Sequence, residues 1–438
     1  MSVLVDDSHT GRRLKIAFFD YHDVFEDFYP HYGVTQLAFA TAWAGTGAHA
    51  FVAALQQHVG DVIWYASSLV PEVTTAHHKV TGCEVKFLQS SWLHRQLWRA
   101  YYWPKIAWRA PRLWQRTRAA YPVYAVLASY TALLSRQTLA TLRADRPDIL
   151  FVQDYATGRF DVLVLLARVL GIPLVAVHMG SRPERYVGRL AKRWTIPRAD
   201  RLIASSRTEL EMLARRYGIA RDRLDLILTP IDTATYCPMD RTQACRAAGL
   251  DPERRYVLFV GRLDDPVKRV SLLMRSFADL ASTYRDADLL IVGNGPDGEG
   301  LRRLAAELGS NRIRLVGWVT DAERKAQLYN AAECLVLCSR SEGFPTVVGE
   351  ALACGAPVLG TRVGGIPELV IDGETGWLIG ADDTVALGRR LDFVLGHPDE
   401  VHRMRPRARQ VAAARVSADS VGLALRQSFT QARAHAHG

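Results

Sequence analysis

Two glutamates in the segment 341–355, SEGFPTVVGEALACG, are placed where carboxylates could bind hydroxyl groups. Glu342 lies in a loop after the apolar run 334–338, and Glu350 lies about one turn into the helical pattern that follows. The free N–H groups of a helix start bind anions, and Gly343 lets the backbone come close to a ligand. The segment therefore predicts a site for a ligand with a central phosphate and hydroxyl groups at both ends.

Two cations in another loop fit the same kind of ligand. In the run 259–277, Arg262 is predicted to end a strand and Lys268 to open a helix. Either residue alone would most often be a solvated charge. Together they could stabilise negative charge that develops on a leaving diphosphate.

Apolar runs that alternate with helical patterns give the expected scaffold. The predicted strands are 14–19, 61–66, 148–153, 173–178 and 201–205, followed by 256–261, 288–293, 313–318, 334–338 and 357–360. Continuous apolar strands of this kind are typical of parallel sheets that are covered by helices on both faces. The run 225–238 contains two prolines and interrupts the pattern, so it is predicted to be a linker.

The fold class expected from this pattern is α/β with two doubly wound, Rossmann-like domains. We expect an N-terminal domain over 1–233, a second domain over 234–410 and a terminal helix over 411–438 that packs back toward the N-terminal domain. Ligands of doubly wound sheets bind beyond the carboxyl ends of the strands. A cleft between the two domains is therefore the expected site.

The stretch 339–379 closely resembles the donor-site signature of the retaining family 4 glycosyltransferases, which have the GT-B fold. The resemblance implies that Glu342 contacts the hydroxyls of the donor sugar and Glu350 those of the nucleotide ribose. It also implies that Arg262 and Lys268 bind the diphosphate. The other donor-binding residues that it implies are Gly343, Phe344, Pro345 and Thr346.

The N-terminal half resembles the family more loosely. Gly33 stands where the family has a glycine-rich loop near the diphosphate, and His178 stands where a histidine often lies near the donor sugar. Asp154 stands where acceptor-side residues gather. A histidine at the end of a strand is also often a structural residue, so a structural role for His178 stays open.

The activity that the resemblance implies is transfer of a sugar from a nucleotide sugar to an acceptor hydroxyl with retention of configuration. The leaving phosphate would act as the base, and neither a metal nor a cofactor is expected. Asp286 and Asp288 have the spacing of a metal-binding pair but head a strand, which favours a capping role. The expected acceptor is a glycan, lipid-linked or small, and nucleic acid is not an expected partner.

Two other classes of function stay open. A dinucleotide-dependent oxidoreductase is favoured by Gly293-x-Gly295-x-x-Gly298 after a strand, with Asp321 predicted to end the next strand. That motif lies on the second βαβ unit of its domain, whereas such a fingerprint normally opens the first. A non-catalytic relative that binds sugar nucleotides or membranes is the other alternative, although both glutamates and both cations are present.

Composition and cysteine usage bear on the compartment of the protein. The net charge of +10 over 438 residues favours anionic partners. The six cysteines include no Cys-x-x-Cys pair, and Cys334 and Cys338 are predicted to be buried, which fits a reducing compartment. The start is a poor signal peptide, and the apolar run 162–177 is too interrupted to span a bilayer. We therefore expect a cytoplasmic protein.

The segment 92–118 is unusual because it holds five tryptophans, seven Lys or Arg and no acidic residue. Lys105, Arg109, Arg112 and Arg116 would fall on one face of a helix, opposite apolar residues. This pattern is typical of an interfacial amphipathic helix on an anionic membrane, here the inner face of the cell membrane. A helix packed on its own sheet with a solvated basic edge is the alternative.

Overall fold

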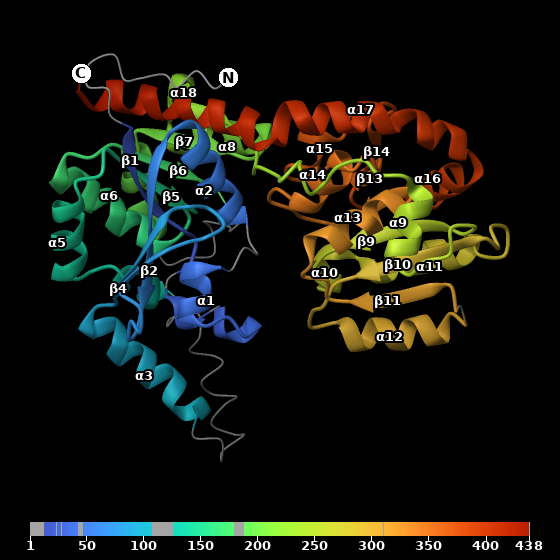
Figure 1. Cartoon of the computed structure of the whole chain (residues 1–438), viewed down its shortest axis with the longest axis horizontal. Coiled ribbons are helices and arrows are strands. Elements are labelled where there is room, and N and C mark those ends of the chain that lie inside the picture. Colours follow the sequence, from blue (N-terminus) through green and yellow to red (C-terminus); the bar gives the residue numbers. More distant parts are fainter. Residues whose placement is uncertain are drawn as a thin grey trace. The chain divides into compact units, whose positions relative to one another are not determined.

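The computed structural model describes residues 13–22, 24–27, 29–42, 47–106, 126–178, 188–309 and 311–437. Contacts divide the chain into two compact units, which Figure 1 shows coloured along the sequence. The N-terminal unit comprises Met1–Ser205, Glu209–Ile227 and Gly422–Gly438, and the C-terminal unit comprises Ser206–Thr208 and Leu228–Val421. The units separate six residues before the predicted boundary at 233/234, and the helices of the predicted segment 411–438 begin earlier, at Pro398.

The N-terminal unit is built on an eight-stranded sheet with the order β3-β4-β2-β1-β5-β6-β7-β8. Its strands are β1 Leu14–Phe19, β2 Gly60–Ser68, β3 Thr75–His77, β4 Glu84–Gln89, β5 Ile149–Gln153, β6 Leu174–Val177, β7 Arg201–Ala204 and β8 Leu224–Leu226. The described strands pair in parallel except β3, which runs antiparallel to β4. The carboxyl ends of β1, β5 and β6 therefore lie side by side at one edge of the sheet.

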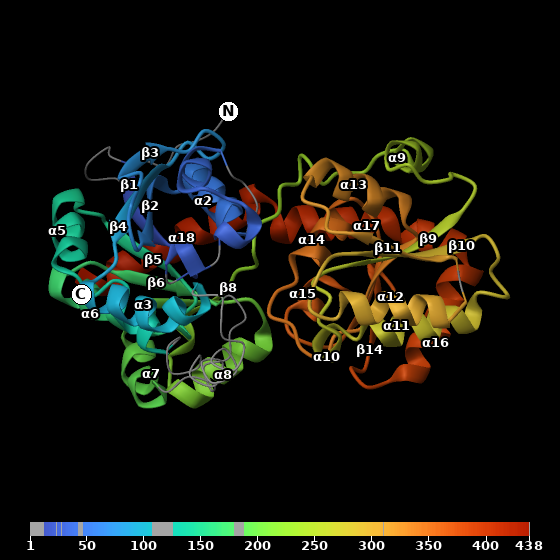
Figure 2. The same ribbon diagram turned by 90° about the horizontal axis from the view of Figure 1, so that it is seen from below.

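Helices cover both faces of this sheet (Figures 1 and 2). The helices of this unit are α1 Gln36–Thr41, α2 Gly47–His58, α3 Trp92–Ile106, α5 Arg136–Asp145, α6 Gly158–Leu170, α7 Arg189–Thr195, α8 Arg207–Tyr217 and α18 Ala418–His437. Short 3-10 turns are η1 Phe25–Asp27, η2 Tyr29–Tyr32, η4 Ile196–Arg198 and η5 Arg221–Arg223.

The two faces are filled by alternate residues of the same strands, because successive side chains of a strand point to opposite sides. Phe18 packs edge-on against Trp64 at 5.3 Å and lies 5.6 Å from Phe151. The next residue, Phe19, stacks on Tyr65 at 5.1 Å on the other face. This alternation fixes the orientation of β1, so the residues that follow it emerge at the carboxyl edge of the sheet.

The C-terminal unit has a six-stranded parallel sheet with the order β11-β10-β9-β12-β13-β14. Its strands are β9 Arg255–Val260, β10 Ala287–Val292, β11 Ile313–Gly317, β12 Cys334–Leu337, β13 Val358–Thr361 and β14 Gly376–Ile379. Its helices are α9 Arg241–Ala247, α10 Asp265–Lys268, α11 Val270–Leu280, α12 Gly298–Glu307, α13 Ala322–Ala331, α14 Thr346–Ala353, α15 Ile366–Leu369, α16 Thr384–Gly396 and α17 Pro398–Val416.

Each predicted strand corresponds to an observed one, with small shifts at the ends. The prediction missed β3, β4 and β14, and it was wrong for part of the predicted linker 225–238, because β8 covers Leu224–Leu226. β4 alternates buried and half-buried residues, so it lacks the continuous apolar run that marked the other strands. Pairing with β7 supplies the partner that makes β8 a strand.

The pair Asp286 and Asp288 binds arginines. Arg255 donates to both oxygens of Asp286, at 2.7 and 2.8 Å, and Arg254 and Arg314 both form ion pairs with the buried Asp288. The two carboxylates therefore anchor strand ends instead of capping a turn as predicted. All six cysteines are free thiols, and Cys334 and Cys338 are buried as predicted.

Candidate active site

The carboxylate of Glu342 is buried in the C-terminal unit and is held by a cation. Lys268 donates from Nζ to Oε1 at 2.6 Å and to Oε2 at 2.8 Å, although the two residues are 74 positions apart. The hydroxyl of Ser339 donates to Oε1 at 2.6 Å. Only 7% of the Glu342 side chain and 20% of the Lys268 side chain are exposed. Two predicted donor-site residues thus meet in one ion pair with fixed geometry.

A second loop supports the backbone of Glu342 from behind. A Cβ atom on Gly364 would lie 2.2 Å from the carbonyl oxygen of Glu342, and Gly364 has φ of +53°. The N–H of Gly365 donates to the carbonyl oxygen of Gly343 at 2.7 Å. Glycine is required here because any side chain would push the two loops apart.

Helix α14 begins at Thr346. Pro345 is its N-cap, with φ of −77° and ψ of 105°, and no side chain among the described residues caps the helix. The first N–H groups of a helix lack acceptors within the helix, so this end offers donors to an anion. Gly343, Phe344 and Thr346 are half-buried around it.

Glu350 faces helix α13 and has two partners that the sequence did not point out. The hydroxyl of Tyr329 donates to Oε2 at 2.8 Å, and Lys325 lies 3.4 Å from Oε1. Burial, together with the charge of Glu350, raises the pKa of Tyr329 well above its usual value. The phenol therefore stays protonated and remains a donor. In the sequence, Lys325 and Tyr329 are linked to each other by their spacing of four residues, which places them on one helix face.

Arg262 and Lys268 occupy different local structures from those predicted. Strand β9 ends at Val260, so Arg262 lies in the loop beyond it, where its side chain is exposed and has no ion-pair partner in the described part of the chain. Lys268 ends the short helix α10 instead of opening a helix. Arg269, with φ of +56°, separates α10 from α11. The turn at Arg269 directs Lys268 toward Glu342 while Arg262 stays accessible.

The glycines of Gly293-x-Gly295-x-x-Gly298 pack against the loop that carries Arg262. A Cβ atom on Gly293 would lie 1.9 Å from the carbonyl oxygen of Gly261, and one on Gly295 would lie 2.4 Å from that of Leu263. The N–H of Leu263 also donates to the carbonyl oxygen of Asn294 at 2.9 Å. The motif therefore serves close contact between two loops.

The dinucleotide interpretation required Asp321 to end a strand, but the structure places it elsewhere. It is the N-cap of α13, and its side chain accepts a hydrogen bond from the N–H of Glu323. An acidic residue at a strand end would bind the ribose of a dinucleotide. The oxidoreductase alternative therefore loses its acidic residue, and close loop packing gives its glycines another role.

His178 follows β6 in the N-terminal unit and lies beside a buried carboxylate. Its Nδ1 is 3.5 Å from Oε1 of Glu209. Tyr155 donates its hydroxyl to the same carboxylate, and the N–H of Ser205 donates to Oε2 at 3.0 Å. Burial raises the pKa of Glu209, and the nearby His178 partly offsets that rise. Nδ1 of His178 makes no hydrogen bond within the described residues, so the carboxylate lies next to the imidazole without fixing its orientation.

Asp154 lies at the end of β5 in a left-handed conformation, with φ of +70°. The Asp154 carboxylate is 5% exposed and accepts from the N–H of Ala156 at 3.0 Å. A non-glycine residue with positive φ stores strain that is common at functional sites. In this structure the side chain also shapes the turn into α6.

A buried network that follows β1 was not predicted from the sequence. Asp20 directly follows β1, accepts from the hydroxyl of Tyr29 at 2.9 Å, and lies 3.3 Å from Nδ1 of His22. Burial alone would raise the pKa of Asp20, but His22 and Arg159 more than offset it and the pKa is lowered. Asp-x-His directly after a predicted strand was the signal available in the sequence.

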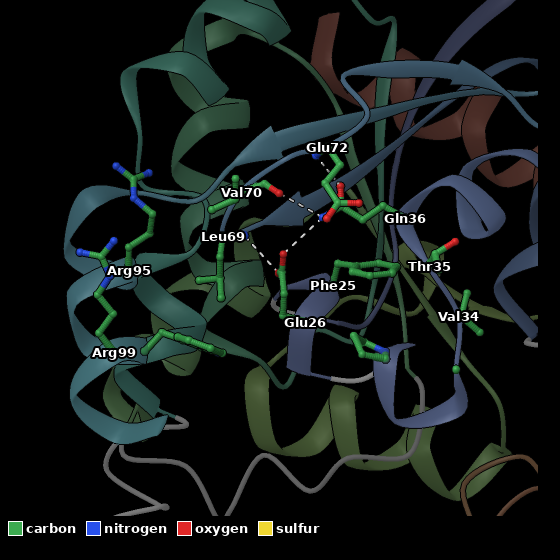
Figure 3. A pocket seen from close by; sticks show the side chains of 13 residues that line it. Phe25, Glu26, Val34, Thr35, Gln36, Leu69, Val70, Glu72, Arg95 and Arg99 are labelled. Atoms are coloured by element: carbon green, nitrogen blue, oxygen red, sulfur yellow. Dashed lines mark hydrogen bonds between the residues drawn. The ribbon is translucent and has the colours of Figure 1, made fainter. Parts of the chain in front are cut away.

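Gly33 follows η2 with φ of +70°, and a Cβ atom there would meet nothing within 4 Å. It lines a cavity of the N-terminal unit, which Figure 3 shows from close by. Glycine is therefore needed for the turn and not for packing.

The described residues contain no group of three or more His, Cys, Asp or Glu that could hold a metal ion. None of the helices in the described ranges is both long and apolar enough to cross a membrane. Helix α3 covers the first part of the segment 92–118, whereas residues 107–118 and the side chains from Ala100 onward lie outside the described residues.

Comparison with known proteins agrees with this geometry. Solved structures with the same fold include the UDP complex of Anabaena HepE, with a TM-score of 0.68 and 17% identity over 95% of this chain and 100% of that one. Sucrose-phosphate synthase from Thermosynechococcus elongatus has a TM-score of 0.67 and 21% identity over 96% of this chain and 99% of that one. With its two parallel-sheet units, the chain is a protein of the GT-B fold.

Two models of protein families match the chain and identify its family. One, described as glycosyl transferases group 1, matches residues 240–411, and the other, described as glycosyltransferase family 4, matches residues 44–235. The chain belongs to the family 4 glycosyltransferases.

Curated relatives match part of the chain. The D-inositol 3-phosphate glycosyltransferase of Nocardia farcinica is 38% identical over 242 residues, which are 53% of this chain and 53% of that protein. That of Acidothermus cellulolyticus is 34% identical over 51% of this chain and 55% of that protein. The chain spans about half the length of the curated relatives it matches.

Replacing Gly295 with alanine should destabilise the C-terminal unit, because the new Cβ meets backbone atoms of Leu263 that cannot give way freely. We expect a loss of about 1–3 kcal/mol, as for overpacked sites. Gly300→Ala is the matched control, since a Cβ there meets nothing within 4 Å and alanine favours a helix. Thermal unfolding measures both, and equal melting temperatures for the two variants would contradict the packing role.

Proposed function

We propose that the chain transfers a sugar from a nucleotide-sugar donor to an acceptor hydroxyl with retention of anomeric configuration. The observation that carries the proposal is the buried Glu342 carboxylate, held by Lys268 immediately before the uncapped start of α14. This arrangement offers a carboxylate for sugar hydroxyls, and a cation and N–H groups for phosphate. Membership in a glycosyltransferase family supports the same activity.

In this proposal the diphosphate of the donor binds to Lys268, Arg262 and the first N–H groups of α14. Arg262 is exposed and unpaired among the described residues, so it needs no rearrangement to reach an anion. Lys268 would share its three N–H donors between Glu342 and a phosphate oxygen. These charges stabilise the leaving diphosphate as the glycosidic bond breaks.

The acceptor attacks from the side of the leaving group, and a phosphate oxygen takes its proton. Configuration is then retained without a protein nucleophile. Glu342 binds the sugar hydroxyls and Glu350 binds the ribose hydroxyls. Gly33 lies in the loop near the diphosphate. His178, which lies beside Glu209, contacts the donor sugar, and Asp154 lies on the acceptor side. The UDP complex of Anabaena HepE makes UDP sugars the first donors to test.

Glu350→Ala should weaken binding of a UDP sugar, whereas Glu342→Ala should lower kcat at saturating donor. Each hydrogen bond to a charged group contributes about 1.5–3 kcal/mol, so loss of the ribose contacts should raise Kd about tenfold or more. Glu342 acts on the sugar that changes shape in the transition state. Calorimetry and initial rates measure the two effects.

Glu307→Ala is the control for both variants, because Glu307 is an exposed carboxylate of α12 in the same unit. The proposal fails for Glu350 if its variant binds donor as Glu307→Ala does. It fails for Glu342 if kcat stays within about a factor of two of wild type, since a lost transition-state contact should cost more.

We propose that no metal takes part, because Arg262, Lys268 and α14 can neutralise the diphosphate. The rate should therefore be unchanged in excess EDTA. Loss of activity that Mg²⁺ or Mn²⁺ restores would show that a divalent ion is required. Initial rates before and after dialysis against EDTA distinguish these outcomes.

We further propose that the enzyme works in the cytoplasm on the inner face of the cell membrane, where the segment 92–118 contacts anionic lipid. Trp92 and Leu93 at the start of α3 are 67% and 49% exposed, which suits an interfacial helix. Basic residues near an anionic surface contribute about 1 kcal/mol each. The combined change of Lys105, Arg109, Arg112 and Arg116 to Gln should therefore remove most vesicle binding.

Flotation with anionic and neutral vesicles measures this binding, and high salt should mimic the variant because salt screens surface charge. The melting temperature should stay near that of wild type. Wild-type protein that binds neither vesicle type would contradict membrane association and would favour packing of the helix on its own sheet.

A further inference from the structure

The cavity of the N-terminal unit has a volume of about 570 Å³, within the usual range for small-molecule sites. Its lining comes from the turns after β1, from the loop after β2 and from one face of α3. The apolar part of that lining is Phe25, Pro30, Val34, Leu69, Val70 and Trp98. The cavity is therefore a preformed site with mostly apolar walls.

The polar groups of the inner wall are bonded to one another. Glu26 accepts from the hydroxyl of Ser68 at 2.6 Å and from the N–H of Leu69 at 3.0 Å. The Gln36 amide donates to the carbonyl oxygen of Val70 at 3.1 Å and accepts from the N–H of Glu72 at 2.9 Å. Figure 3 shows the bonds of this wall that join Glu26 to Leu69 and Gln36 to Val70 and Glu72. Little hydrogen-bonding capacity remains for a ligand rich in hydroxyls.

The charges around the cavity are arranged by sign. Glu26 and Glu72 belong to the wall formed by the loops after β1 and β2, whereas Arg95 and Arg99 belong to α3 on the other side (Figure 3). The two arginines are one helical turn apart, so they lie on the same helix face. Their guanidinium groups lie at the outer edge of the cavity, away from Glu26 and Gln36.

The arginines keep donors for a ligand. Arg95 uses Nη1 on the carbonyl oxygen of Ser90, at 2.5 Å. Arg99 is exposed, and within the described part of the chain it forms no ion pair. Guanidinium groups bind phosphate oxygens in pairs of parallel hydrogen bonds. An anion would thus be attracted to the α3 edge and repelled from the wall with the carboxylates.

We propose that this cavity binds a phosphate ester with an apolar organic part, its phosphate on Arg95 and Arg99 and its chain against Phe25, Leu69 and Trp98. The inference rests on the proposed function, because such a ligand would be the acceptor or its lipid carrier. The bonded inner wall favours a lipid phosphate over a polyol phosphate, which would need free partners for its hydroxyls.

Calorimetry with farnesyl phosphate, below its micelle concentration, tests the site in the full chain. Farnesol and inositol 1-phosphate serve as probes that lack the phosphate and the apolar chain, respectively. Arg95→Gln/Arg99→Gln should weaken farnesyl phosphate binding at least about tenfold. The matched control is Arg136→Gln/Arg143→Gln, because both are exposed arginines of α5 in the same unit.

A second variant tests the apolar wall of the cavity. Val70 is 66% exposed, so Val70→Glu should leave the fold intact while it places a carboxylate at the cavity. It should also weaken farnesyl phosphate binding at least about tenfold, since a second negative charge repels the phosphate. Equal binding to wild type and to both cavity variants would overturn the proposal. So would farnesol or inositol 1-phosphate binding as tightly as farnesyl phosphate.

The same preparations separate this inference from the proposed function. A UDP sugar should raise the melting temperature of wild type and of Arg95→Gln/Arg99→Gln alike, because neither arginine is among its proposed contacts. Stabilisation by UDP sugar without farnesyl phosphate binding would refute the cavity proposal alone. Farnesyl phosphate binding that is sensitive to Arg95 and Arg99, without any response to nucleotide sugars, would refute the proposed function alone.

Discussion

A carboxylate removed from water must be paired and hydrogen-bonded, or it will be neutralised. Glu342 meets this condition through Lys268 and Ser339, and the loops of the C-terminal unit are arranged to make those contacts. The left-handed Arg269 ends α10 so that Lys268 faces the carboxylate, and Gly364 lets a further loop lie behind it. The site thus depends on one ion pair between segments that are distant in sequence.

That pair also sets the electrostatics of the unliganded site. The charge of Lys268 is balanced by Glu342, whereas Arg262 remains exposed. In the proposed function a diphosphate can reach Arg262 without breaking an ion pair, whereas it must share Lys268 with the carboxylate. In the N-terminal unit, Asp20 and Glu209 are buried carboxylates beside His22 and His178, so the same requirement for a partner shapes the carboxyl edge of that sheet.

Much of the fold could be predicted from the sequence, because buried parallel strands are continuous apolar runs. β4 escaped detection because its residues alternate in burial, and β8 is a strand through its pairing with β7. For the site, the sequence indicated carboxylates and cations in loops, and the family resemblance supplied their expected roles. The partners of Glu350 could not be predicted, since they depend on how α13 packs beside α14.

The loops of the candidate donor site contact one another through backbone atoms. Gly293, Gly295 and Gly364 each leave room for the carbonyl group of a neighbouring loop, so the spacing of the loops is set by main chain and not by side chains. Side chains elsewhere on those loops can then change during evolution while the scaffold keeps its shape. A single architecture of this kind can diverge toward different sugars and acceptors through substitutions that leave its frame untouched.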